Sequence, residues 1–136
     1  MVRDNISKYL GYYHNYLEIN CITIINDFYK KELNIDDIEK IIPSDIKNRN
    51  WMKKISLEQI DEWALTYGKK VSLTEARDFD VMVFKSERFQ RPIHFSMFFK
   101  PCNMLHLEEG STSRYESISN EWRECIHAIY RHKSLV

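Results

Sequence analysis

The feature that most constrains the fold is a set of three short apolar segments in the second half of the chain. They are rich in β-branched and aromatic residues, and polar or turn residues separate them: 80–85, 93–100 and 103–108. Short apolar runs with such boundaries are typical of β-strands. Ser119 is a suitable cap for a brief helix through Trp122, and residues 126–132 then predict a last strand.

The first half of the chain has a helical pattern instead. From Cys21 onward the apolar residues follow the spacing of one helix face, and two lysines fall near the expected C-terminal turn. Ser56 and Gln59 form the pattern of a capping box, and Gly68 would end the helix that follows. Helices followed by an antiparallel meander predict an α+β fold.

Two further segments carry weaker signals. Asp4 or Asn5 could cap a short helix over residues 6–13, because both side chains accept from free backbone N–H groups. Residues 41–51, around Pro43, predict a loop or a broken helix. With 136 residues and no repeat or linker, the chain is expected to form a single domain, 1–136.

Composition excludes several classes of function. Lys+Arg and Asp+Glu both total 20 and form no long run, which argues against nucleic-acid binding. We find no apolar segment of transmembrane length, and the charged N-terminus lacks the apolar core of a signal peptide. We therefore expect synthesis in the cytoplasm, no membrane partner, and free thiols at all three cysteines. Metal-ligand spacing is absent from the sequence, so we expect neither metal nor cofactor.

Cys21 and two histidines are the candidates for chemistry. Cys21 is either a small core residue or a nucleophile at a helix N-terminus, where the dipole would depress its pKa. His94 and His106 lie in successive predicted strands, so a hairpin would bring both imidazoles to one face. A helix packed on that face would add Cys21, which gives a thiol, a base and an orienting group.

The order of these motifs resembles the NlpC-type cysteine peptidases, which are compact papain-like cell-wall hydrolases. The resemblance runs from about residue 12 to residue 131. Asn20 and Cys21 stand where the family usually has Asp-Cys, and four segments match its strands: 79–84, 93–98, 104–106 and 129–131. Among these, 79–84 corresponds to the family's Gly-Asp-hydrophobic strand. Ile22 and Thr23 replace small residues of the family pattern, and Ser96 replaces a glycine.

The resemblance implies a role for each candidate residue. Cys21 would be the nucleophile, His94 the general acid/base and His106 the residue that orients His94. The backbone N–H of Cys21 would bind the oxyanion, and an upstream tyrosine would contribute to substrate or oxyanion binding, with Tyr13 and Tyr16 as the main candidates beside Tyr12. We interpret the acidic pair at 108–109 as solvated. We interpret the remaining cysteines and histidines as structural residues: Cys102, Cys125, His14, His127 and His132.

The resemblance also implies an activity. The chain would be a thiol endopeptidase or amidase that cleaves the stem peptides of bacterial peptidoglycan. A bare domain of this size resembles the versions found at phage tail tips, where the virion delivers the domain and phage tail proteins are its partners. The alternative is a catalytically weak or inactive structural component of such a tail tip.

Overall fold

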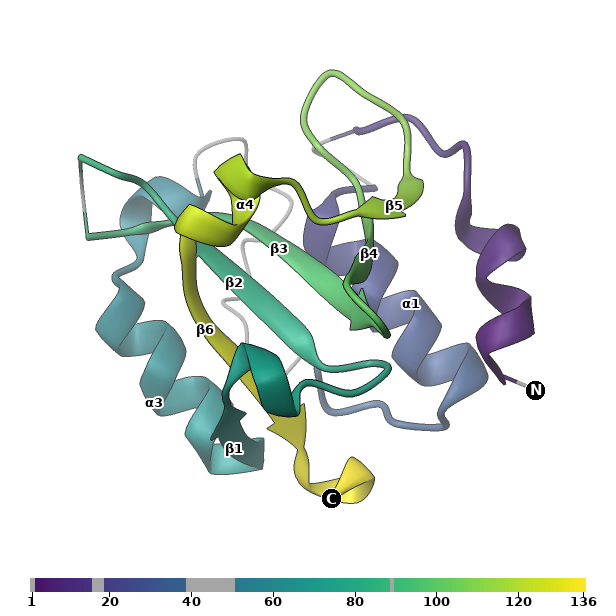
Figure 1. Cartoon of the computed structure of the whole chain (residues 1–136), viewed down its shortest axis with the longest axis horizontal. Helices are drawn as coiled ribbons and strands as arrows, with labels where there is room; N and C mark the ends of the chain where they lie inside the picture. The colour runs from purple at the N-terminus through teal and green to yellow at the C-terminus, as the bar shows by residue number, and fades with distance from the viewer. Residues whose placement is uncertain (1, 16–18, 39–50, 89) are drawn as a thin grey trace.

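The computed structural model describes residues 2–15, 19–38, 51–88 and 90–136, and these contain one six-stranded antiparallel sheet (Figure 1). The strand order is β1-β6-β2-β3-β4-β5. The strands are β1 (Gly68–Val71), β2 (Val81–Lys85), β3 (Pro92–Phe99), β4 (Asn103–His106), β5 (Arg114–Ser117) and β6 (Ile126–His132). This mixture of helices and antiparallel sheet confirms the expected α+β class.

The principal helices begin where the sequence places them. The helix α1 (Cys21–Glu32) starts at Cys21 and carries Lys30 and Lys31 in its last turn. The predicted capping box opens α3 (Leu57–Tyr67), and a short helix, α4 (Asn120–Glu124), follows its Ser119 cap. In Figure 1, α1 lies beside β3 and β4, and α3 lies beside β1 and β6. The short helix α4 lies near the start of β6.

The prediction for residues 6–13 is wrong in type and in bounds. The segment is a 3-10 helix, η1 (Val2–Tyr9), that starts earlier and ends sooner. In a 3-10 helix residues three apart lie on one side, and Ile6 and Tyr9 use this spacing to pack against the core. Gly11, with φ of +83°, then turns the chain away. The predicted loop at 41–51 lies outside the described residues up to residue 50, and η2 (Trp51–Lys54) follows it.

The meander prediction holds for β2, β3 and β4, which pair in chain order. It misses that β6 inserts between β2 and β1, and it misses β1 and β5 altogether. Both missed strands have four residues and no more than one large apolar side chain each, so neither gives an apolar signal. Gly68 is the C-cap of α3, as expected, and it also lets β6 approach, since a Cβ there would lie 2.0 Å from the Arg131 oxygen.

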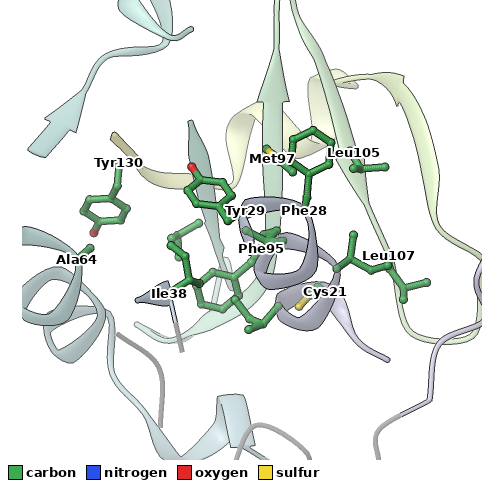
Figure 2. Packing of buried hydrophobic residues seen from close by; sticks show 14 of the residues in the cluster. Cys21, Phe28, Tyr29, Ile38, Ala64, Phe95, Met97, Leu105, Leu107 and Tyr130 are labelled. Carbon is green, nitrogen blue, oxygen red and sulfur yellow. The ribbon is translucent and has the colours of Figure 1, made fainter. Parts of the chain in front are cut away.

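Side chains alternate between the two faces of the sheet. Along β3, Phe95, Met97 and Phe99 join the cluster under α1, part of which Figure 2 shows. Phe98 belongs to a second cluster on the opposite face, with Met104 and Phe84, and the Trp122 ring of α4 packs against it. Alternation therefore places the side chain of His94, like that of Phe98, on the face away from α1.

A buried ion pair joins the start of β2 to the end of β6. Arg131 donates to both carboxylate oxygens of Asp80 at 3.0 and 2.8 Å, and the two side chains are only 4% and 1% exposed. Phe79, directly before Asp80, has φ of +81°, a conformation that glycine adopts without strain. The family resemblance pairs this position with a glycine. The Tyr29 hydroxyl donates to the Phe79 carbonyl and so ties α1 to the same corner.

Within the described parts of the chain, no helix combines the length and the apolar character needed to cross a bilayer.

Candidate active site

Cys21 is the first residue of α1 because Asn20 caps the helix. The Asn20 Oδ1 accepts from the N–H groups of Ile22 and Thr23 at 3.0 and 3.1 Å. The Thr23 hydroxyl accepts from the Asn20 N–H at 2.7 Å, which completes a capping box. Asn20 and Thr23, two departures from the family pattern, therefore act together to fix the position of Cys21.

The Cys21 thiol is buried, with 3% of the residue exposed. Figure 2 shows it at the start of α1, in the same cluster as Phe95 and Leu107. Burial raises the pKa of the thiol to about 12, and the backbone N–H groups of Phe95, Cys21 and Ile22 lower it only in part. The expected depressed pKa is therefore wrong, because desolvation outweighs the helix N-terminus at this position.

The two histidines form a direct contact, as the hairpin predicts. The Nε2 of His94 lies 2.9 Å from the Nδ1 of His106, and both side chains are buried. The His94 ring stacks on Phe84, with centroids 5.7 Å apart, and also packs against Trp122 at 4.9 Å. Strand pairing and ring packing together hold the imidazole of His94 in one orientation.

Both imidazoles are held neutral at ordinary pH. Burial lowers the pKa of His94 to about 3. Repulsion from Arg114, and from His106 or His14 whenever either ring is protonated, acts in the same direction. Burial also lowers the pKa of His106, although its hydrogen bond and charge interaction with Glu116 oppose this. A neutral imidazole has one ring nitrogen free to accept a proton, which is what a general base requires.

Cys21 and His94 line the same cavity, whose volume is about 180 Å³. Among the described residues, no hydrogen bond joins the thiol to either imidazole. The link is through the backbone, since the N–H of Phe95, the residue after His94, acts on the thiol. The structure therefore brings His94 and His106 into contact, but on the face of the sheet away from α1, where the His94 ring packs against Phe84 and Trp122. The expectation that the helix of Cys21 packs on the face of the two imidazoles is wrong, because alternation along β3 turns Phe95, and not His94, toward α1. Cys21 and His94 meet only at the cavity that both line.

Comparisons with known proteins identify the fold. No protein-family model matches the sequence, and no curated protein matches it. Several solved structures match the chain, and each of the following three matches 96% of it. An NlpC/P60 family protein from Bacillus cereus ATCC 10987 has a TM-score of 0.67 at 14% identity, with 39% of its own chain covered. A lipoprotein-like NLP/P60 family protein from Staphylococcus aureus subsp. aureus Mu50 has a TM-score of 0.60 at 16% identity, with 40% covered. The NlpC/P60 domain of the peptidoglycan hydrolase SagA has a TM-score of 0.60 at 13% identity, with 95% covered.

The chain has an NlpC/P60 fold. It spans about two fifths of the first two structures and nearly all of the SagA domain. The fold assignment agrees with the resemblance drawn from the sequence motifs. At these identities it concerns the fold alone, so the roles of Cys21, His94 and His106 are taken up as proposals below.

The tyrosines expected from the resemblance do not gather at the cavity. In the NlpC/P60 fold of this chain, Tyr13 is 77% exposed and pairs with Thr112 in an isolated bridge. Tyr12 borders a different depression, beside α1 and η1. Tyr16 lies outside the described residues. The role proposed for Tyr13 at the substrate or oxyanion therefore has no support from its position.

Other side chains do line the cavity, and sequence reasoning missed them. His14 is one of its walls, although we interpreted it as structural. Lys53 and Arg91 bring positive charge, and Glu109 brings negative charge. These residues come from segments far apart in sequence, so no local pattern marks them as a group.

An acidic cluster lies behind the histidines, where we expected solvated carboxylates at 108–109. The Nε2 of His106 lies 2.7 Å from a carboxylate oxygen of Glu116, and Arg114 donates to Glu116 and Glu108 at 3.3 and 2.7 Å. The ligand atoms of His106, Glu108 and Glu116 lie within 4.8 Å of one another, a spacing that could suit a cation. The Arg114 guanidinium already bridges the two carboxylates, however, so the group fits an ion-pair network better than a metal.

Proposed function

We propose that the chain is a thiol hydrolase that cleaves peptide bonds in the stem peptides of bacterial peptidoglycan. Cys21 is the nucleophile, His94 the general acid/base and His106 the residue that orients His94. The observation that carries the proposal is the His94–His106 contact beside a cavity that Cys21 shares. The fold likeness to the domain of SagA, itself a peptidoglycan hydrolase, supports the substrate class.

The proposed reaction moves one proton at each stage. The Cys21 proton passes to His94 as the sulfur attacks the carbonyl carbon, and the backbone N–H of Cys21 binds the oxygen that gains charge. The tetrahedral intermediate collapses, the C–N bond breaks and His94 returns the proton to the leaving amine. Water then attacks the thioester carbonyl carbon while His94 takes its proton. The C–S bond breaks, the carboxylic acid leaves, and His94 returns the proton to the Cys21 sulfur.

The buried state of the catalytic groups shapes this mechanism. Cys21 has a raised pKa and His94 a lowered one, so both groups are neutral before substrate binds. The proton therefore moves during the attack, in contrast to enzymes that hold a preformed thiolate–imidazolium pair. Catalytic hydrogen bonds often form only once the substrate is in place, which accounts for the lack of a thiol–imidazole bond in the free protein.

The charges around the cavity suit a peptide that has both signs of charge. Lys53 and Arg91 can attract carboxylate groups, and Glu109 can attract an amine. Stem peptides contain both kinds of group. The cavity of about 180 Å³ holds a side chain or a short peptide segment rather than a whole crosslink.

A single substitution tests the proposal. Cys21→Ala should leave a folded protein that releases no fragments from purified peptidoglycan, because members of a catalytic triad act as a unit. The change removes one buried sulfur and should lower the free energy of unfolding by about 1 kcal/mol. Cys102→Ala, which removes a thiol elsewhere, is the matched control and should release fragments at the wild-type rate. Fragment release by Cys21→Ala would overturn the role of Cys21.

The burial of Cys21 and His94 also favours a second candidate function. A thiol with its pKa raised to about 12, beside a histidine with its pKa lowered to about 3, is poorly prepared for catalysis. We therefore also propose, as the alternative, a catalytically weak or inactive structural component of a phage tail tip. Wild-type protein that releases no fragments, yet sediments with peptidoglycan, would favour this alternative. The tail-tip location is part of this proposal and rests on the sequence resemblance, in which the virion delivers the domain to the cell wall.

A further inference from the structure

The hydrogen bonding of the histidine pair extends beyond His106 to Glu116. A carboxylate oxygen of Glu116 on β5 lies 2.7 Å from the Nε2 of His106, whose Nδ1 in turn lies 2.9 Å from the Nε2 of His94. Three side chains on three successive strands thus form one continuous chain of hydrogen bonds. Glu116 lies opposite Met104 in the register, on the same side of the sheet as His106.

The direction of these hydrogen bonds follows from the charge of Glu116. Partial burial alone would raise the pKa of Glu116, but the hydrogen bond from His106 and the positive charge of Arg114 bring it below its ordinary value. Glu116 is therefore ionised at neutral pH, and an ionised carboxylate only accepts hydrogen bonds. His106 must then carry its proton on Nε2.

The same reasoning fixes the proton on His94. A neutral His106 that donates from Nε2 has a bare Nδ1, which can only accept. The Nε2 of His94 must therefore carry the hydrogen that lies between the two rings. This leaves the Nδ1 of His94 without a proton, as the ring nitrogen that can receive one.

Glu116 is itself held in place from the other side. Arg114 donates to it at 3.3 Å, to Glu108 at 2.7 Å and to the Ser111 hydroxyl at 2.6 Å. These contacts fix the guanidinium, and the guanidinium keeps the neighbouring carboxylate ionised and oriented. The charged groups that act on the two histidines are thus Glu116, Glu108, Arg114 and, at longer range, His14.

We propose that Glu116 is a positioning residue which, through His106, sets the tautomer of His94 and so presents a bare Nδ1 to accept the proton of the nucleophile. The inference rests on the proposed function and adds a fourth member to the three residues implied by the resemblance. Glu116 neither gains nor loses a proton in the reaction. When His94 takes the Cys21 proton on Nδ1, the carboxylate stabilises the resulting positive charge through His106.

Glu116→Gln tests the inference, because an amide can donate where a carboxylate cannot. The Gln amide can donate to the Nε2 of His106, which moves the His106 proton to Nδ1 and the His94 proton to Nδ1 as well. We expect kcat for fragment release to fall by about 10- to 100-fold with KM little changed. Glu116→Asp, which keeps the acceptor, should retain more activity than Glu116→Gln. Glu121→Gln, the same change at an exposed residue of α4, should match the wild type.

Nitrogen NMR of protein labelled in its histidine rings gives a readout that needs no activity. In the wild type at neutral pH we expect the ring proton of His94 on Nε2, assigned by loss of the signal in His94→Gln. In Glu116→Gln it should shift toward Nδ1. A wild-type His94 protonated on Nδ1 would overturn the inference, and so would a Glu116→Gln protein with unchanged tautomers and unchanged kcat. The NMR result decides the inference whether or not the wild-type protein hydrolyses peptidoglycan, so its failure and that of the proposed function are distinct.

Discussion

At the scale of single residues, the position of Cys21 sets two electrostatic effects against each other. A helix N-terminus favours the thiolate by about 0.3–1 kcal/mol at an exposed site, and more where the site is partly buried. Full burial disfavours the charged form by up to several pKa units. The sequence predicts the first effect, because the apolar spacing of a helix begins at Cys21. The second depends on how closely Phe95 and Leu107 cover the sulfur, which no local pattern reveals.

Thiol reactivity checks which effect prevails. We expect iodoacetamide to label Cys21 more slowly than Cys102 and Cys125 in the folded protein at neutral pH, because Cys21 is buried and the others are half-buried. Peptide mass spectrometry of a labelling time course measures the three rates. In urea the three rates should converge, which controls for intrinsic differences. Faster labelling of Cys21 in the folded protein would show instead that a thiolate forms without substrate.

At the scale of elements, the capping box of α1 links stability to the position of the nucleophile. Asn20 stands where the family usually has aspartate, and both residues can cap a helix. The cap satisfies the N–H groups of Ile22 and Thr23 directly beside Cys21. A change at Asn20 should therefore affect both folding and the environment of the thiol.

Asn20→Ala should lower the free energy of unfolding by about 1 kcal/mol, because the buried N–H of Ile22 and the partly buried N–H of Thr23 lose their acceptor. Asn20→Asp should stay close to the wild type. Ser56→Ala, which removes the matching cap of α3, should cost a similar amount, so it serves as the control. Only Asn20→Ala should also change the labelling rate of Cys21. Equal labelling rates in the two alanine variants would contradict a local role for the cap, and urea denaturation gives the stabilities.

How much the sequence predicts depends on how local each signal is. The start of α3 follows from its capping box, and the start of α1 follows from the apolar spacing that begins at Cys21. The His94–His106 contact follows from two apolar strands joined by a short turn. Glu116 was missed because it lies on β5, a four-residue strand whose polar sequence carries no strand signal. The walls of the cavity were missed because only the folded chain brings their segments together.

At the scale of the whole molecule, buried neutral histidines make stability depend on pH. His94 has its pKa lowered from 6.5 to about 3 in the folded protein, whereas the unfolded chain titrates near the ordinary value. Below pH 6.5 the unfolded chain therefore binds a proton that the folded chain does not. The contribution of neutral His94 to the free energy of unfolding is complete above pH 6.5 and is lost as the pH falls toward about 3.

This predicts a measurable difference between the wild type and His94→Gln. For the wild type, the free energy of unfolding should fall by up to about 1.4 kcal/mol per pH unit for each histidine kept neutral, as the pH drops below 6.5. His94→Gln should lose less stability over the same interval, although it is less stable at neutral pH. Urea denaturation at about pH 7.5 and about pH 5 checks this, above the range where carboxylates titrate. Equal losses in the two proteins would contradict a neutral buried His94.

β1 is the first strand in the order of the six-stranded sheet and so forms one of its edges. Unpaired backbone groups on such a border can add a strand from another molecule, and charged side chains there oppose this. β1 carries Lys69 and Lys70 at its centre, both exposed, and Lys70 is engaged with Asp61 at 3.3 Å. If the β1 edges of two copies approached each other, the positive charge of Lys69 on one copy would repel the lysines of β1 on the other. The lysines of the edge strand β1, which directly follows α3, therefore disfavour the edge-to-edge pairing that leads to self-association and fibril growth.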